Sequence, residues 1–254
     1  MRLDGKIVVI TGAGSGMGRA MALRFAKEGA TIVGTDIASD RIEEVGREVA
    51  DAGGVMTPLV TDVSKREDAE KMVRTAIENH GALDVLVNNA GIMDQFQGVA
   101  TIDDDTWQRV IAVNLHGPMY AMRVAVPFMK EHGGGSIVNV ASAAGVGGGA
   151  AGAAYTASKH GLVGLTRNTA FTYAPMGVRC NAILAGGVET NIQDSIDMSK
   201  ADQEALQQLG TWHASMPATL KAEDIANLAL FLASDESVRI SGALIAADAG
   251  WLAA

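Results

Sequence analysis

Three residues in the second half of the chain carry side chains that could move a proton to or from a substrate. Tyr155 and Lys159 lie at positions i and i+4 of a stretch with helical character, and Ser142 lies upstream of them. Residues at i and i+4 share one face of a helix. A phenol has a reference pKa of about 10, and a nearby ammonium lowers it by favouring the phenolate. Such a pair also arises by chance on exposed helix faces, but Ser142, just past an expected strand, favours a general acid/base site.

A glycine-rich turn near the N-terminus could bind a phosphate. Thr11 to Gly18 follows the apolar run Ile7 to Ile10 and leads into the helical stretch Met17 to Glu28. Glycines allow a pyrophosphate to approach the backbone, and the helix N-terminus offers it free N–H groups. The spacing is T-G-x-x-x-G-x-G and not the stricter G-x-G-x-x-G, since Arg19 stands at the third glycine position. The strand, turn and helix context favours a dinucleotide site over a plain tight turn.

A carboxylate at the end of the second expected strand bears on the choice of dinucleotide. Asp36 follows the glycine-rich turn and the first helical stretch. At this place a carboxylate accepts hydrogen bonds from the ribose 2′- and 3′-hydroxyls. It also repels the 2′-phosphate of NADP. The alternative is an ordinary surface aspartate, but the glycines before it favour NAD as the cofactor.

The elements that must position these groups alternate along the chain. Short β-branched runs alternate with longer helical stretches, as in a doubly wound sheet. The runs are apolar throughout, which is typical of a parallel sheet covered on both faces. The seven expected strands are Ile7 to Ile10, Thr31 to Thr35, Val55 to Val60, Val85 to Val87, Ile137 to Val140, Val178 to Ile183 and Leu244 to Ala246. The sequence therefore predicts one α/β domain over residues 1–254: a Rossmann fold with a seven-stranded parallel sheet and helices on both faces. The irregular segment 190–222 is expected to form a substrate lid.

Composition excludes several other classes of protein. The chain has 254 residues and a formal net charge of −9, so nucleic acid and anionic membranes are poor partners. Cys180 is the only cysteine, which rules out an intrachain disulfide. The five histidines are scattered, so no metal is expected. No apolar run is long enough for a signal peptide or a membrane span. We therefore expect a soluble, cytoplasmic protein.

Taken together, the motifs resemble the short-chain dehydrogenase/reductase family along essentially the whole chain. They occur in the order and with the spacing of that family. The matching pieces are Thr11 to Gly18, Asp62-Val63, Asn88 to Gly91, Asn114, Ser142, Tyr155 with Lys159, and Asn181 to Thr190.

The resemblance implies a hydride transfer between NAD(H) and a secondary alcohol or ketone. Tyr155 is then the general acid/base, and Lys159 lowers its pKa and binds the nicotinamide ribose. Ser142 hydrogen-bonds the substrate oxygen, and Asn114 holds a water that relays protons from Lys159. The implied cofactor contacts are Gly12, Ser15, Gly16, Met17, Gly18, Asp36, Asp62, Val63, Asn89, Ala90, Gly91, Tyr155, Lys159, Gly186, Val188 and Thr190.

The substrate pocket is less well defined. Its candidate lining residues are mostly apolar, and they predict a neutral, moderately apolar substrate. They are Met93, Gln95, Phe96, Ala144, Val146, Ile192, Ile196, Met198 and Trp212. One departure from the family is Ala185 in place of the usual proline after the sixth strand, which frees φ and adds an N–H donor.

The sequence also leaves two alternative functions to consider and predicts an oligomeric state. The chain also resembles 3-oxoacyl-acyl-carrier-protein reductases, but these usually prefer NADP and need a basic patch, so Asp36 and the charge of −9 count against this alternative. A catalytically silent NAD-binding regulator would be expected to lose Tyr155, Lys159 or Ser142. The family resemblance and the small or apolar residues of two helical stretches, 104–130 and 151–174, predict a homotetramer. The C-terminal segment 250–254 is expected to be able to pack on a neighbouring subunit.

Overall fold

The chain forms a parallel sheet of seven strands in the order β3-β2-β1-β4-β5-β6-β7. This computed structural model describes residues 1–253. The strands are β1 (Ile7–Thr11), β2 (Thr31–Asp36), β3 (Val55–Val60), β4 (Val85–Asn88), β5 (Gly135–Val140), β6 (Val178–Ala185) and β7 (Leu244–Ala247). All seven expected strands are confirmed. Between β3 and β4 the chain crosses from one side of β1 to the other, so the carboxyl ends of β1 and β4 flank the crevice where open α/β sheets bind ligands.

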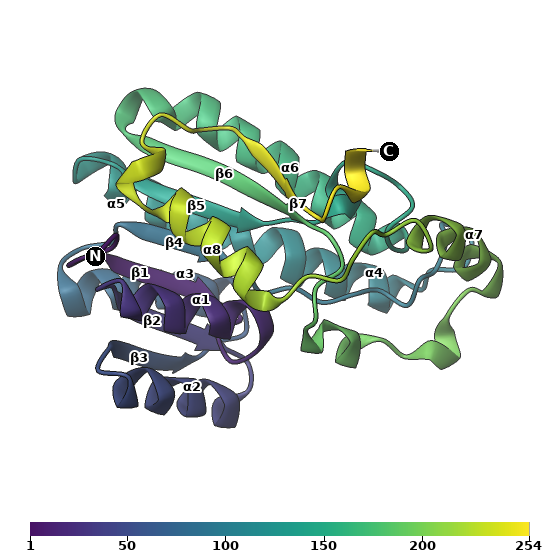
Figure 1. Cartoon of the computed structure of the whole chain (residues 1–254), viewed down its shortest axis with the longest axis horizontal. Helices are drawn as coiled ribbons and strands as arrows, with labels where there is room; N and C mark the ends of the chain where they lie inside the picture. Colours follow the sequence, from purple (N-terminus) through teal and green to yellow (C-terminus); the bar gives the residue numbers. More distant parts are fainter. Residues whose placement is uncertain (254) are drawn as a thin grey trace.

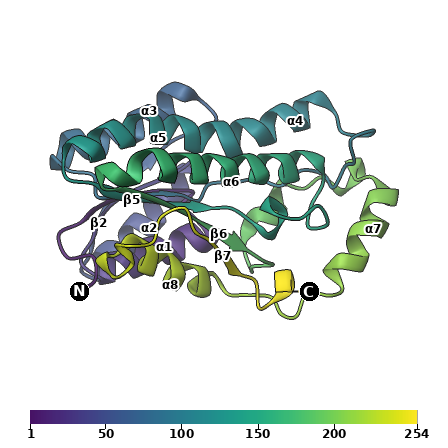
Figure 2. The ribbon, with the colours of Figure 1, turned by 90° about the horizontal axis from the view of Figure 1, so that it is seen from above.

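Helices cover both faces of the sheet, as predicted (Figures 1 and 2). One face carries α1 (Gly16–Lys27), α2 (Ser39–Asp51) and α8 (Ala222–Ala233). The other carries α3 (Arg66–His80), α5 (Gly117–Glu131) and α6 (Ala153–Tyr173). Each layer buries its own apolar cluster against the sheet. Phe25 and Leu230 belong to the first cluster, and Met72 and Met129 to the second.

The edge strand β3 departs from the expected burial. Val55 and Val60 at its two ends are 57% and 55% exposed. β3 pairs only with β2, so one side of it lacks a neighbouring strand. The run is mostly apolar, but its side chains are only partly covered, whereas those of the central strand β1 are all buried. The prediction of full cover is therefore wrong at β3.

Two helical segments also differ from expectation. The stretch 104–130 is not one regular helix: α4 (Asp104–Ile111) passes through a π-helical turn, Ala112–His116, into α5. The segment 190–222 contains α7 (Gln203–His213), although helix signals in its sequence are modest. Asp202 caps α7 by accepting hydrogen bonds from the backbone N–H groups of Glu204 and Ala205, each at 3.0 Å. In Figures 1 and 2 this segment projects beyond the carboxyl ends of the strands.

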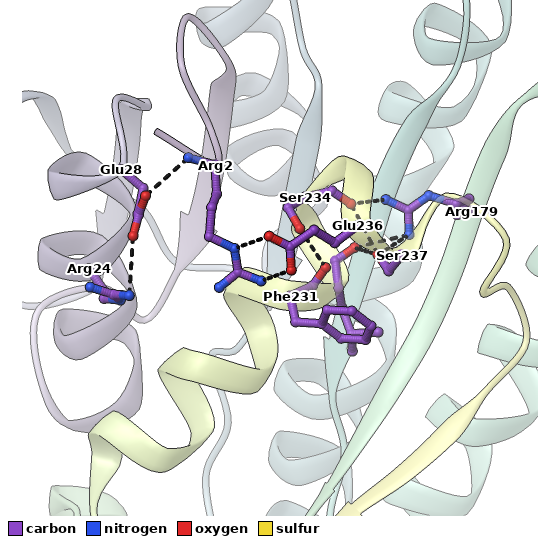
Figure 3. A network of polar contacts seen from close by, with 9 residues as sticks. Arg2, Arg24, Glu28, Arg179, Phe231, Ser234, Glu236 and Ser237 are labelled. Carbon is purple, nitrogen blue, oxygen red and sulfur yellow. Dashed lines mark hydrogen bonds and ion pairs between the residues drawn. The ribbon is translucent and has the colours of Figure 1, made fainter.

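Polar contacts at the opposite end of the sheet tie the N-terminus to the chain after α8 (Figure 3). Arg2 donates two hydrogen bonds to the carboxylate of Glu236, at 2.8 and 2.6 Å. Arg179 of β6 donates to the Ser237 hydroxyl at 2.9 Å and to the Ser234 carbonyl at 3.2 Å. These contacts fix α8 against the sheet, well away from the residues expected to do chemistry. Among residues 1–253, no helix combines the length and the apolar character needed to cross a membrane.

Candidate active site

A cavity of about 350 Å³, here called the first cavity, lies at the carboxyl ends of the central strands. Most of the residues expected to bind a cofactor line it. They are Gly12, Ser15, Gly16, Met17, Asp36, Asp62, Val63, Asn89, Ala90, Gly91 and Thr190. Gly186, Val188 and Tyr155 instead line a second cavity, which shares Met17, Thr190 and Ile192 with the first. The structure thus brings widely separated parts of the chain to one crevice.

Gly18 has a packing role and does not line either cavity. A Cβ at this position would lie 1.9 Å from the Gly12 carbonyl oxygen, so only glycine allows α1 to approach the turn after β1 this closely. Gly16 has a φ of +49°, a conformation that glycine adopts at little cost. These two glycines open the N-terminus of α1 to the first cavity.

The lining of the first cavity fits a dinucleotide. The first turn of α1 carries no acidic side chain that would compete with an anion for its N–H groups. Asn89 donates from Nδ2 to the carbonyls of Thr11 and Gly12, while its Oδ1 is buried without a hydrogen-bond partner. A buried acceptor without a donor is costly, and the residue that carries it lines the first cavity.

Asp36 is held firmly at the rim of the first cavity. It is 8% exposed and accepts hydrogen bonds from the N–H groups of Gly14 at 3.1 Å and Ala38 at 3.0 Å. Arg41 of α2 lies 3.6 Å from the same carboxylate and also lines the cavity. Sequence reasoning missed Arg41. A basic residue at the start of the helix that follows the acidic strand end was the available signal.

Ser142, Tyr155 and Lys159 converge on the carboxyl end of β5. Ser142 follows β5 and begins a 3-10 turn, Ala143–Gly145, while Tyr155 and Lys159 lie on one face of α6. Lys159 Nζ donates to the Val140 carbonyl at 2.9 Å and is 5.4 Å from the centre of the Tyr155 ring. A Cβ on Gly91 would lie 3.5 Å from this Nζ, so Lys159 reaches the wall of the first cavity from behind.

Burial dominates the protonation of this pair. It raises the pKa of Tyr155 to about 12, although a hydrogen bond with Ser142 lowers it in part, and the Asp94 carboxylate raises it further. Burial also lowers the pKa of Lys159 to about 8. Burial therefore outweighs any lowering of the phenol pKa by Lys159 in this structure, and the role of Lys159 in lowering it stays a prediction. For both groups, the change in pKa caused by loss of water is larger than the change caused by the other group one helical turn away.

Asn114 lies in the π-helical turn and is fully buried. Its amide forms two hydrogen bonds with the backbone of Ile92: Oδ1 accepts from the N–H and Nδ2 donates to the carbonyl, each at 2.9 Å. Nδ2 also donates to the Ser158 hydroxyl at 3.1 Å. Asn114 therefore clamps the loop after β4 to the start of α5, beside the helix α6 that carries Tyr155.

The second cavity has a volume of about 500 Å³ and is lined by both Ser142 and Tyr155. Of the expected substrate-pocket residues, the structure places Met93, Phe96, Ile192, Ile196 and Met198 in its wall. His213, Met216 and Trp251 line it as well and were missed, because they approach from the end of α7, from the segment just after it and from the C-terminus.

Four expected pocket residues lie elsewhere. Ala144 is fully buried in a small apolar cluster behind the second cavity, and Val146 is exposed. Gln95 is turned away from the cavity to hydrogen-bond the backbone of Ser195 and Asp197. Trp212 stacks on Trp251, with ring centres 4.5 Å apart. This contact also shows that the C-terminal segment packs on its own chain, where its Trp251 indole donates to the Trp212 carbonyl at 3.2 Å.

Ala185, which replaces the usual proline, is the last residue of β6 and pairs with Ala247 of β7. It also lines the second cavity, so the strand ladder continues to the edge of that cavity. Within residues 1–253, no group of three or more acidic, histidine or cysteine side chains is arranged to hold a metal.

Known proteins share this architecture over nearly the full chain. A family model described as enoyl-(acyl carrier protein) reductase matches residues 12–252. The 3beta-hydroxysteroid dehydrogenase 2 of Eggerthella lenta is 41% identical, over 99% of this chain and 96% of its own. A short-chain dehydrogenase from Mycobacterium paratuberculosis, solved with bound NAD, superposes with a TM-score of 0.91 at 32% identity, with full coverage of both chains. A gluconate 5-dehydrogenase described as putative and NAD(P)-dependent, from Beutenbergia cavernae, holds NADP and superposes with a TM-score of 0.87 at 37% identity, covering 99% of this chain and 98% of its own. The chain therefore belongs to the short-chain dehydrogenase/reductase family of oxidoreductases that use nicotinamide cofactors.

Proposed function

We propose that this protein is an NAD-dependent dehydrogenase/reductase that interconverts a neutral, apolar secondary alcohol and its ketone. The observation that carries the proposal is the junction of the two cavities. Ser142 and Tyr155 line the second cavity, and Met17, Thr190 and Ile192 form walls common to both. A substrate carbon held beside Tyr155 would therefore adjoin the first cavity, where the cofactor is expected to bind.

Each residue of the site has a separable task in this reaction. When bound, the nicotinamide ring supplies the acceptor or donor of the hydride. The Tyr155 hydroxyl gives a proton to the ketone oxygen or takes one from the alcohol. Ser142 donates a hydrogen bond to the same oxygen and holds it near the phenol. Lys159 supplies a positive charge that stabilises the phenolate, and Asn114 positions the backbone along which a water-mediated proton relay would run.

The preference for NAD rests on Asp36 and its surroundings. The two backbone N–H bonds and the ion pair with Arg41 hold the carboxylate at the rim of the first cavity. A 2′-phosphate at this place would meet a fixed negative charge, whereas ribose hydroxyls would donate to it. Arg41 reduces the repulsion, so NAD is expected to be preferred rather than used exclusively.

The substrate class follows from the walls of the second cavity. Among the described residues that line it, none is a lysine, an arginine or an acidic side chain. A carboxylate or phosphate on the substrate would have no such cationic partner there. Met93, Phe96, Met198, Met216 and Trp251 instead offer a broad apolar surface, which suits an alicyclic compound with a single polar end.

Reduction of the 3-oxo group of an acyl-carrier-protein thioester is the second candidate, favoured by the 3-oxoacyl-[acyl-carrier-protein] reductase of Thermotoga maritima, which is 38% identical over 98% of this chain and 99% of its own. The deciding experiment measures kcat/KM for a panel of neutral alicyclic alcohols with NAD and for a 3-oxoacyl thioester with NADH and NADPH. We expect turnover of alicyclic alcohols with NAD. A higher kcat/KM for the thioester would favour the second candidate, and no turnover of any substrate would favour a silent NAD-binding regulator.

We also propose that the protein assembles as a homotetramer. The outer face of α6 presents His160, Gly164, Arg167 and Phe171, and Phe171 is 86% exposed. A phenylalanine this exposed on the outer face of a helix is expected to be covered by a second copy of the chain.

A further inference from the structure

A buried carboxylate from the loop after β4 contacts the helix that carries Tyr155. Asp94 is fully buried. Its Oδ1 accepts hydrogen bonds from the N–H groups of Phe96 at 3.1 Å and Gly152 at 3.2 Å, and its Oδ2 accepts from the N–H of Tyr155 at 2.9 Å. A buried carboxylate is costly unless it is hydrogen-bonded, and here all three partners are backbone donors.

The N-terminus of α6 depends on this distant residue. The first N–H groups of a helix have no partner within the helix, and a local side chain usually caps them. The N-cap of α6 is Gly152, which has no side chain, and the first turn carries no acidic residue. Asp94, far earlier in the chain, supplies the missing acceptor. Tyr155 is the third residue of α6, so its backbone is one of the groups held directly.

The fit between the two segments is close. A Cβ on Gly152 would lie 2.6 Å from Asp94 Oδ2 and 2.7 Å from Oδ1. Gly152 has a φ of −73°, which any residue adopts. Glycine is therefore needed at this position to leave room for the Asp94 carboxylate and not for its backbone conformation.

The loop that carries Asp94 is itself fixed. Two residues before Asp94, the backbone of Ile92 is clamped by the Asn114 amide. On the other side of Asp94, Gln95 donates to the carbonyl of Ser195 at 3.2 Å. The position of the Asp94 carboxylate is thus set by contacts of its own loop and not by α6, so the carboxylate can hold the start of α6 in place.

We propose that Asp94 is a positioning residue for proton transfer: it caps α6 from outside the helix and so places the Tyr155 hydroxyl opposite Ser142. The proposal rests on the function proposed above for Tyr155. Asp94 lies outside the two cavities, so it acts through the backbone of Tyr155 and not on the substrate. A displacement of roughly 1 Å in an active site costs about 100-fold in rate, which sets the scale of the expected effect.

The test compares the variants Asp94→Ala and Asp94→Asn with a control substitution at the aspartate that caps another helix, α4. Asp103 is the local N-cap of α4 and accepts from the N–H of Thr106 at 2.8 Å and from its hydroxyl at 2.9 Å, but α4 carries none of the residues assigned to proton transfer. Asp94→Ala should lower kcat by roughly 10- to 100-fold, while the Kd for NADH, followed by fluorescence, should change by less than about 3-fold. Asp94→Asn, which retains one acceptor, should fall between Asp94→Ala and the wild type. Asp103→Asn should leave kcat within about 2-fold.

Gly152→Ala provides a second, independent variant. In the wild-type background its methyl group displaces the Asp94 carboxylate, so kcat should fall as in Asp94→Ala. In the Asp94→Ala background the space is free, and adding Gly152→Ala should change kcat by less than about 2-fold. This non-additivity is the signature of a direct contact.

The outcomes separate the two proposals. Wild-type turnover of the alcohol panel, measured first, decides the proposed function, and its absence would overturn both proposals. Given wild-type turnover, the Asp94 proposal is overturned if folded Asp94→Ala keeps a kcat within about 3-fold of wild type. It is also overturned if kcat and NADH affinity fall together, if Asp103→Asn loses as much, or if Gly152→Ala has the same effect in both backgrounds.

Discussion

Burial of Lys159 should make the stability of this protein depend on pH between about 8 and 10.5. The pKa of Lys159 is lowered from 10.5 to about 8 by burial. Below pH 8 the native state must hold a charged ammonium out of water, and this burial lowers the free energy of unfolding by its full amount. Between pH 8 and 10.5 the native state has released its proton while the unfolded chain still binds one, so the free energy of unfolding rises with pH.

The size of the effect follows from the shift. One pKa unit corresponds to about 1.36 kcal/mol, so a shift of this size corresponds to about 3 kcal/mol. Lys159→Met keeps much of the length of the side chain and removes the charge. The free energy of unfolding of the wild type, minus that of Lys159→Met, should therefore increase by about 3 kcal/mol between pH 7 and pH 10.5.

Urea unfolding of both proteins without cofactor, at several pH values, measures this difference. Taking the difference cancels the titration of the other groups. Lys27→Met, at an exposed residue at the end of α1, controls for the loss of one lysine. A difference between wild type and Lys159→Met that stays flat over this range, or that falls as pH rises, would mean that burial does not lower the pKa of Lys159.

Three further predictions concern the cofactor, the lid and the assembly. Asp36→Ala should raise kcat/KM with NADP relative to NAD by at least about 10-fold, because it removes the repulsion and leaves Arg41 without its partner; an unchanged ratio of kcat/KM values would count against the role of Asp36. Hydrogen exchange in the segment 190–222 should slow when NAD is added, since Thr190 and Ser195 line the first cavity; strong protection in both states would mean a rigid insert. Light scattering should report four copies at micromolar concentration, and Phe171→Glu should dissociate them by placing a charge at the buried contact; a monomeric wild type would refute this assembly.

The sequence was sufficient to predict the sheet and the cofactor crevice, because both depend on local patterns. Apolar β-branched runs marked the strands, and the turn Thr11 to Gly18 marked the point where α1 meets the crevice. The exposure of β3 could not be predicted in the same way. Its run is mostly apolar, and the one signal for an edge position was Pro58, which cannot donate to a strand ladder.

The residues that sequence reasoning missed make contacts between distant parts of the chain. Trp251 lines the second cavity because the C-terminus folds back onto α7, and no periodic pattern signals such a contact. Asp94 follows the Asn88 to Gly91 motif closely, yet its partners Gly152 and Tyr155 come much later in the chain. The net effect of burial on the pKa of Tyr155 was not foreseen, because a helical i, i+4 spacing fixes proximity and says nothing about loss of water.

The most direct test of the account is Tyr155→Phe. The change keeps the ring and its packing in the small cluster at the start of α6 and removes only the oxygen. We expect a folded protein that binds NADH with an affinity within about 3-fold of wild type, while kcat for the best alicyclic alcohol falls by at least about 100-fold, the low end for a general acid/base. A folded Tyr155→Phe variant with near-normal kcat would contradict the assignment of proton transfer to Tyr155.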